Sequence, residues 1–154
     1  MKLNTLNVRT DIDSNSKLAR SFNQLENLLK LVSEKELPEG IINTINTNIN
    51  ELNAITDTGK VLRRQIRKKQ TNIIKLLENE LKIVPKNYYR NTWLAIGMGA
   101  FGVPIGVAFG ISLKNMGLLG AGLPIGLAIG LGIGAGMDKK AFNEGRQLDI
   151  EIKY

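Results

Sequence analysis

The chain has 154 residues, enough for one ordinary domain, and its 21 lysines and arginines against 14 acidic residues give a formal net charge of +7. It contains no cysteine and no histidine, which excludes disulfides, zinc sites of the Cys/His type and catalysis that depends on a histidine base. We therefore expect no enzymatic activity, no metal and no cofactor. The N-terminal stretch MKLNTLNVRTDIDS lacks the apolar run of a secretory signal.

Charge and glycine divide the chain into three parts. The segment 93–137 holds 13 of the 16 glycines and a single charged residue, Lys114, whereas both flanking segments are strongly charged. The sequence predicts an all-α fold with a coiled-coil-like helical domain over 1–92, an apolar helical hairpin over 93–137 and a charged tail over 138–154.

The first part has the spacing of three helices with heptad-like apolar seams. Asp13, Ser14 or Ser16 can cap the first helix, the breaks KELPEG and TDTG separate the three, and Pro85 is expected to end the third near Val84. The helices can form an independent bundle or be steadied by contacts between copies of the chain. The expected core positions are Leu18, Phe22, Leu25, Leu29, Val32, Ile42, Ile45, Ile49, Leu52, Leu62, Ile66, Ile73, Leu77, Leu81 and Val84.

The third helix carries a basic run, RRQIRKK, whose charged residues are Arg63, Arg64, Arg67, Lys68 and Lys69. It can be a solvated helix face, a patch for anionic lipid or a protein partner, or a nucleic-acid surface. The lack of interleaved aromatic residues disfavours nucleic acid. Lipid binding needs the helix to fold back, because an upright helix would hold the run roughly 38 Å from the bilayer, well beyond a Debye length.

Two uncharged runs of 21 and 20 residues, 93–113 and 118–137, follow. About 20 apolar residues cross the hydrocarbon core of a bilayer as a helix, and KNMG over 114–117 can form a tight turn, so we expect a hairpin that crosses a membrane twice. A buried hairpin in a soluble protein is disfavoured because the rest of the chain is too polar to cover it. A β-hairpin pore fits the small/large alternation, but Pro104 and Pro124 would interrupt its strands.

Basic residues flank the two runs on both outer sides, whereas the turn carries only Lys114. The positive-inside rule then places both termini in the cytoplasm and the turn on the other side of the membrane. The residues expected at the membrane–water interface are Tyr88, Tyr89, Arg90, Trp93, Lys139 and Lys140.

Glycine recurs every fourth residue in both runs, which forms a groove along one face of each helix and permits close helix packing in lipid. The positions expected to pack, within or between copies, are Gly102, Gly106, Gly110, Gly122, Gly126, Gly130 and Gly134. A second stripe of small residues lies on the opposite face, two positions out of phase. Its members are Ala100, Pro104, Ala108, Ser112, Gly120, Pro124, Ala128, Gly132 and Gly136. One face suffices to close the hairpin, so we expect the other face to bind a partner, most simply another copy of the chain.

The two runs repeat each other, as GVPIGVAFG over 102–110 and GLPIGLAIG over 122–130. Pro104 and Pro124 can each kink a helix, or can be tolerated as prolines in membrane helices are. With its periodic glycines and doubled PIG, the hairpin resembles glycine-zipper membrane proteins, and the tail DKKAFNEGRQLDIEIKY is similar to those of small bacterial members. The resemblance implies oligomeric packing, as in channels, pore-forming toxins and passive anchors, and does not select among them.

The expected function, in line with this resemblance, is a small protein of a bacterial inner membrane that self-associates through glycine zippers, as a channel or a membrane-permeabilising pore. The alternative is an anchor or scaffold whose cytoplasmic helices recruit a protein partner. The lack of charge inside both spans argues against a selective channel. Both termini alternate in strand fashion, over 2–10 and 147–154, and can pair or remain frayed.

Overall fold

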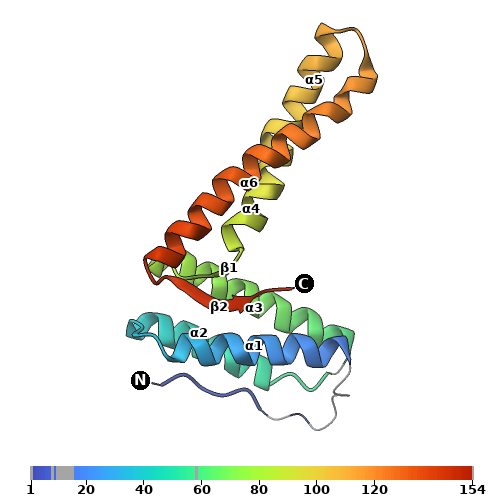
Figure 1. Cartoon of the computed structure of the whole chain (residues 1–154). Coiled ribbons are helices and arrows are strands. Elements are labelled where there is room, and N and C mark those ends of the chain that lie inside the picture. Colours follow the sequence, from blue (N-terminus) through green and yellow to red (C-terminus); the bar gives the residue numbers. More distant parts are fainter. Residues whose placement is uncertain (1, 8, 10–15, 58, 154) are drawn as a thin grey trace. The chain divides into compact units, whose positions relative to one another are not determined.

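The computed structural model describes residues 2–7, 9, 16–57 and 59–153, and the all-α fold class is confirmed (Figure 1). The chain divides into two compact units, one of residues 1–84 with 148–154 and one of residues 85–147. These boundaries differ from the expected ones at 92 and 138, because the hairpin helices continue past the ends of the uncharged runs.

The first unit is a bundle of three helices joined by short connections. Its helices are α1 (Lys17–Ser33), α2 (Glu39–Asn53) and α3 (Lys60–Leu81). Figure 1 shows α1 and α3 running in the same direction with α2 opposed to them. Most of the predicted seams are buried, whereas Phe22 and Leu81 are half-buried. The largest fully buried side chains are Leu25, Leu28, Ile45, Ile49, Leu62, Ile66, Gln70, Ile73 and Leu77.

Two helix ends test the sequence predictions directly. Ser16 caps α1, since its side-chain oxygen accepts from the Ala19 N–H at 3.0 Å, whereas Asp13 and Ser14 lie outside the described residues. The prediction that Pro85 ends α3 is wrong. The helix stops at Leu81 because Lys82 adopts a left-handed conformation (φ 56°), and the following N–H closes the end by donating to the Leu77 carbonyl at 3.2 Å.

The described strands are β1 (Val84–Lys86) and β2 (Gln147–Glu151), which pair in a two-stranded sheet. A C-terminal strand is therefore confirmed within 147–154, but its partner is β1. Of the two outcomes left open for the N-terminal stretch, pairing as a strand is not seen in residues 2–7 and 9.

Side-chain amides of α2 hold the N-terminal segment. Asn46 accepts from the backbone N–H of Asn4 at 2.7 Å and donates to the carbonyl of Lys2 at 3.1 Å. Asn53 repeats this pair of hydrogen bonds three residues further along the segment, at 2.9 and 3.0 Å. Each asparagine thus satisfies one donor and one acceptor of an extended backbone, as a neighbouring strand would.

These two pairs of hydrogen bonds form a ladder, and its spacing follows from the rise per residue of a helix and of an extended chain. Seven helical residues, from Asn46 to Asn53, rise about 10.5 Å, and three extended residues advance about 10 Å. Leu3 and Leu6, also three residues apart, are half-buried. The segment therefore has a period of three set by the helix, where the sequence pattern had indicated a strand period of two.

Arg9 binds backbone carbonyls at the C-terminal end of α2. Its guanidinium donates to the carbonyls of Leu52, Ile55 and Asp57, at 3.4 Å for the first and last. The last carbonyls of a helix lack partners within the helix and carry partial negative charge. Since α2 has no basic residue in its last turn, Arg9 supplies the cation from a distant part of the chain.

We expect Asn53→Ala to loosen the N-terminal segment locally. Loss of hydrogen bonds worth about 0.5–1.5 kcal/mol each should speed amide hydrogen exchange at Asn7 by about threefold to tenfold. Exchange is measured residue by residue with NMR. Asn43→Ala, on the exposed side of α2, is the matched control and should leave the rate unchanged; equal effects of the two variants would contradict the ladder.

The second unit is a hairpin of two helical arms (Figure 1). The first arm comprises α4 (Tyr88–Ile96), the π-helix η1 (Gly97–Gly102) and α5 (Val103–Ser112); the second comprises the 3₁₀ turn η2 (Met116–Leu118) and α6 (Leu119–Asn143). In the described chain, the two segments 88–112 and 116–143 are long and apolar enough to cross a membrane. At the turn, the left-handed residue is Lys114 (φ 48°) and not Gly117.

Candidate functional site

The two arms of the hairpin touch backbone to backbone along the predicted glycine stripe. A Cβ added at Gly126 would lie 2.5 Å from the Gly102 nitrogen, and one added at Gly134 would lie 2.6 Å from the Arg90 Cα. Real Cβ atoms do not approach this closely, so no other residue type fits without movement of the backbone. The positions where an added Cβ would lie within 3.0 Å of the opposite backbone are Gly97, Gly106, Gly122, Gly126, Gly130 and Gly134.

The other two predicted glycines are less tightly enclosed. A Cβ at Gly102 would lie 3.2 Å from the Gly122 carbonyl oxygen, and one at Gly110, near the turn, would come no closer than 3.4 Å to the Met116 sulfur. All seven predicted glycines are nevertheless buried. The stripe therefore packs the hairpin on itself, and contacts between copies would have to use another face.

The π-helix adds a glycine to this stripe that the sequence pattern missed. Buried glycines step by four from Gly110 to Gly102, and the next buried position is Gly97, five residues earlier. Within η1 the backbone hydrogen bonds span five residues instead of the four of an α-helix. The Val103 N–H, for example, donates to the Met98 carbonyl. A strict step of four would have placed Met98 against α6, where there is no room for a side chain.

Pro104 gives a physical reason for the π turn. A proline cannot donate to the carbonyl four residues back, and its ring clashes with that carbonyl; π turns in helices arise where the ladder is disturbed in this way. Pro124, at the equivalent place in the repeat, lies inside α6, which is α-helical from Leu119 to Asn143. The two prolines thus have different backbones around them although their local sequences match.

Asp138 ties the open end of the hairpin together. It lies four residues after Gly134, in register with the glycine stripe, and is only 8% exposed. Its carboxylate oxygens accept from the backbone N–H of Tyr89 at 3.1 Å and of Arg90 at 2.9 Å. These are first-turn donors of α4, where a negative charge is favourable, and the residue before the helix, Asn87, makes no side-chain cap of its own.

The predicted interface residues gather at the same end of the hairpin. Tyr88 and Tyr89 stack edge to face with ring centroids 5.3 Å apart. Trp93 is half-buried, and its carbonyl faces Gly130, whereas Lys139 and Lys140 are exposed. Of the six predicted residues, Tyr89, Arg90 and Trp93 therefore contribute backbone contacts that the sequence did not indicate.

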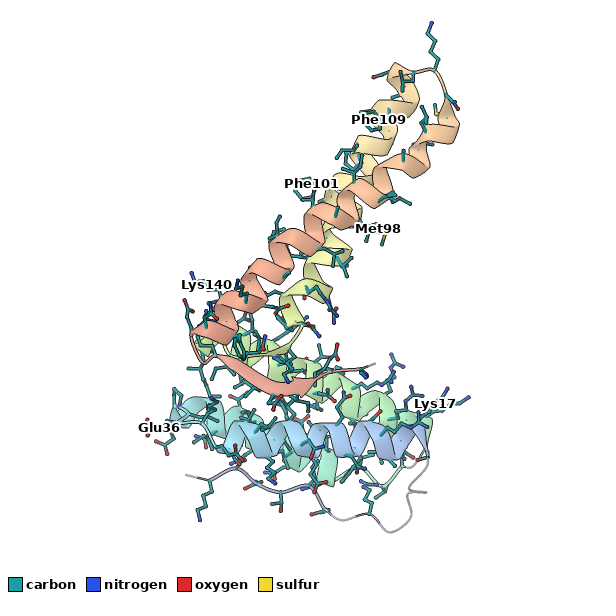
Figure 2. All side chains as sticks on the ribbon, viewed as in Figure 1. Lys17, Glu36, Met98, Phe101, Phe109 and Lys140 are labelled. Carbon is teal, nitrogen blue, oxygen red and sulfur yellow. The ribbon has the colours of Figure 1, made fainter. Side chains whose placement is uncertain are left out.

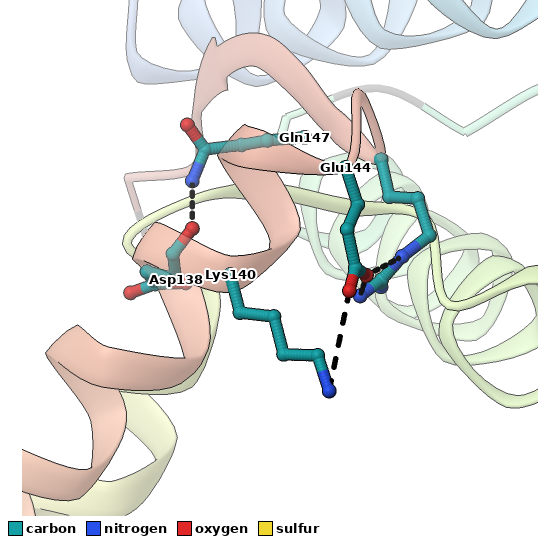
Figure 3. Close-up of polar contacts among 5 residues, drawn as sticks. Asp138, Lys140, Glu144 and Gln147 are labelled. Atoms are coloured by element: carbon teal, nitrogen blue, oxygen red, sulfur yellow. Dashed lines mark hydrogen bonds and ion pairs between the residues drawn. The ribbon is translucent and has the colours of Figure 1, made fainter.

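A polar cluster follows at the end of α6 (Figure 3). Glu144 accepts from the Arg146 guanidinium, with the Nε atom at 2.8 Å, and lies 4.0 Å from the Lys140 ammonium. The hydrogen bonds from Arg146 lower the pKa of the Glu144 carboxyl, and the charges of Arg146 and Lys140 act in the same direction. The Gln147 side chain donates to the Asp138 carbonyl at 3.4 Å, so the chain leaving α6 is fastened to the helix.

The second small-residue stripe lies on the outside of the hairpin. A Cβ added at Gly99, Gly120, Gly132 or Gly136 would meet no atom of the described residues within 4 Å. Large apolar side chains flank this stripe, and Figure 2 shows Met98, Phe101 and Phe109 projecting away from the hairpin. The hairpin thus closes on one glycine face and leaves the other uncovered within the described chain.

The basic run of α3 does not form a single patch. Arg63 and Arg67 are half-buried and line a groove with α1, whereas Lys69 forms an ion pair with Glu51 of α2. Arg64 and Lys68 are exposed. The five charges that are adjacent in the sequence therefore lie in three different environments: the groove with α1, the ion pair with α2 and solvent.

Comparison with models of protein families, with curated proteins and with solved structures gives no match. The resemblance to glycine-zipper membrane proteins stays a prediction from the residues.

We expect Asp138→Ala to destabilise the hairpin by about 1–3 kcal/mol, because it leaves two buried N–H groups without an acceptor. Asp138→Asn should cost less, since one amide oxygen still accepts. The measurement is the midpoint of helix loss when sodium dodecyl sulfate is titrated into micelles of the purified protein. Glu144→Ala, an acidic residue in an exposed ion-pair cluster, should leave the midpoint unchanged.

We expect Gly126→Ala to destabilise hairpin packing and Gly132→Ala to leave it unchanged. The first inserts a methyl group against backbone and should destabilise by about 1–3 kcal/mol; the second enters open space and should be neutral. The same micelle titration compares the two. Equal sensitivity at the two positions would show that the arms do not touch along the predicted stripe.

Proposed function

We propose that this chain is an integral membrane protein whose hairpin crosses a bilayer twice and associates with copies of itself. The observation that carries the membrane part is the exposure of the apolar arms. In their most apolar windows, 22% and 17% of the residues are buried, whereas the core helix of a soluble protein is mostly buried. Ile111 and Leu113, for example, are 64% and 63% exposed.

A bilayer accounts for this exposure physically. In water the apolar surface of both arms would be unfavourable, whereas lipid tails are as apolar as the side chains. Helices satisfy their backbone hydrogen bonds internally, which a lipid environment demands. The glycines, poor helix formers in water, then cost little and allow the close approach of the two arms.

The proposed orientation follows from charge. Lys114 is the one charged residue between Trp93 and Met137, and it lies at the turn. Basic residues flank the open end of the hairpin, opposite the turn. By the positive-inside rule this end faces the cytoplasm of a bacterium, and both termini of the chain lie on the same side. Trp93 and the tyrosines near it suit the interface at that end.

Self-association is proposed through the outward stripe, which is the second small-residue stripe and comprises Ala100, Pro104, Ala108, Ser112, Gly120, Pro124, Ala128, Gly132 and Gly136. The support is that the inward stripe is already filled by the other arm, while Cβ atoms at the outward glycines would meet nothing. Small residues on a membrane helix let a second helix approach closely. The outward stripe is thus available for the packing that the inward stripe uses within one copy.

A pore, in this proposal, can form only between copies. Contact of the backbones leaves no space along the axis of one hairpin, and Ser112 is the polar side chain that the outward stripe offers. Such a pore would be weakly selective. The second candidate function, a membrane anchor for the helical domain, is favoured by the bundle of α1, α2 and α3, which has its own core.

We expect the protein to remain with membranes after an alkaline carbonate wash, and recovery as a soluble monomer would refute the membrane proposal.

For self-association, Gly132→Leu should weaken assembly by at least about tenfold, which corresponds to about 1.4 kcal/mol, as measured by energy transfer between labelled copies in liposomes. Ile133→Leu, on a bulky face, is the matched control. Dye leakage from the same liposomes separates the two functions: leakage lost in Gly132→Leu supports a pore, and assembly without leakage supports the anchor.

A further inference from the structure

A basic groove lies in the helical bundle, between the first halves of α1 and α3. It has a volume of about 410 Å³. Lys17 and Arg20 line it from α1, and Arg63 and Arg67 line it from α3. The two helices run in the same direction (Figure 1), so these four residues come from the same end of the bundle.

The C-terminal segment adds a fifth cation. The backbone N–H of Lys153 donates to the Gln24 side chain at 3.0 Å, which holds this residue over α1, and Lys153 and Gln24 both line the groove. Three segments far apart in the sequence therefore bring positive charge to one place.

The charge of the groove is not compensated within the described chain. No aspartate or glutamate is among the lining residues, and no ion pair between described residues involves Lys17, Arg20, Arg63 or Arg67. By contrast, Lys69 on another side of α3 pairs with Glu51. The groove thus differs from the rest of the basic run.

Arg63 has, in addition, a buried donor without an acceptor. Its Nε atom is inaccessible to solvent and makes no hydrogen bond with the described residues. A buried donor is normally paired, because leaving it unpaired costs the full desolvation of the group. An anion in the groove would offer this N–H an acceptor oxygen.

The helix dipoles act in the same direction as the side chains. Neither α1 nor α3 has an acidic residue in its first turn. Instead, basic residues stand in these turns, at Lys17 and Arg20 in α1 and at Lys60 and Arg63 in α3. Cations are unfavourable at the positive end of a helix, so two helices starting side by side concentrate a positive potential that an anion would relieve.

We propose that this groove binds a phosphate group, carried either by a phospholipid headgroup or by a soluble phosphorylated ligand. Arginine guanidinium groups recognise phosphate oxygens with paired hydrogen bonds, and lysines add charge. Arg20 and Arg67, from facing helices, supply such groups from two sides. The site uses Arg63 and Arg67 of the basic run and excludes Arg64 and Lys68, which are exposed. It concerns the helical bundle and is independent of how the hairpin assembles.

The experiment uses the full chain in nanodiscs and two sources of phosphate. In the first arm, pyrophosphate is titrated by calorimetry, at constant ionic strength, onto protein in purely zwitterionic nanodiscs. In the second, without soluble phosphate, the thermal midpoint of the helical bundle is followed as the fraction of phosphatidylglycerol in the nanodisc rises. The groove variant is Arg20→Gln/Arg67→Gln, and the matched control is Arg64→Gln/Lys68→Gln, which removes the same charge from exposed positions.

We expect saturable binding or stabilisation in at least one arm, weakened at least tenfold in the groove variant and less than twofold in the control. Saturation in the first arm alone assigns the site to soluble ligands, and in the second alone to lipid headgroups. Circular dichroism checks that both double variants keep the helical content of the parent chain. Absence of saturation in both arms, or equal weakening by the two variants, would overturn the proposal.

Discussion

The hairpin depends on one constraint, the approach of two helix backbones to a distance at which no Cβ fits. At Gly126 and its neighbours along the stripe, the opposite arm occupies the space that any side chain would need. Packing of this kind derives from van der Waals contact over a long, smooth surface, and it keeps its strength where the hydrophobic effect vanishes. This packing also determines which residues lie on the outer surface of the hairpin. Because the arms meet along the inward glycines, the bulky residues and the second small-residue stripe face outward.

Keeping such a contact in register over a long hairpin needs adjustment of the backbone. The repeat offers α6 an unbroken series of glycines at a step of four, but in the first arm the series is interrupted at Met98. The π-helix between Gly97 and Gly102 inserts one residue into the turn and returns a glycine to the interface. A helix defect beside Pro104 thus preserves the packing, whereas the matching sequence around Pro124 stays α-helical.

Charges supplied from a distance recur at the helix ends of both units. Arg9 binds the Leu52 carbonyl at the end of α2 and two carbonyls just beyond it, and Asp138 binds N–H groups in the first turn of α4. In each case the helix lacks a suitable residue of its own in the terminal turn, and the ion comes from a segment that must already be folded against it. These contacts therefore couple the ends of helices to the tertiary structure. The starts of α1 and α3 are the exception, since their first turns hold basic residues and no acidic one.

The sequence by itself determined the elements whose signal is local. Apolar seams at a step of three and four identified α1, α2 and α3, the uncharged runs identified the hairpin, and the glycine period identified a face suited to close packing, within or between copies. The tertiary structure alone decided what depends on a distant partner: the end of α3 at Leu81, the place of Gly97, the role of Asp138, the period of three in the N-terminal segment and the division of the basic run. Periodicity records which residues share a face of one element, whereas register and capping depend on what the opposite element leaves unfilled or unpaired.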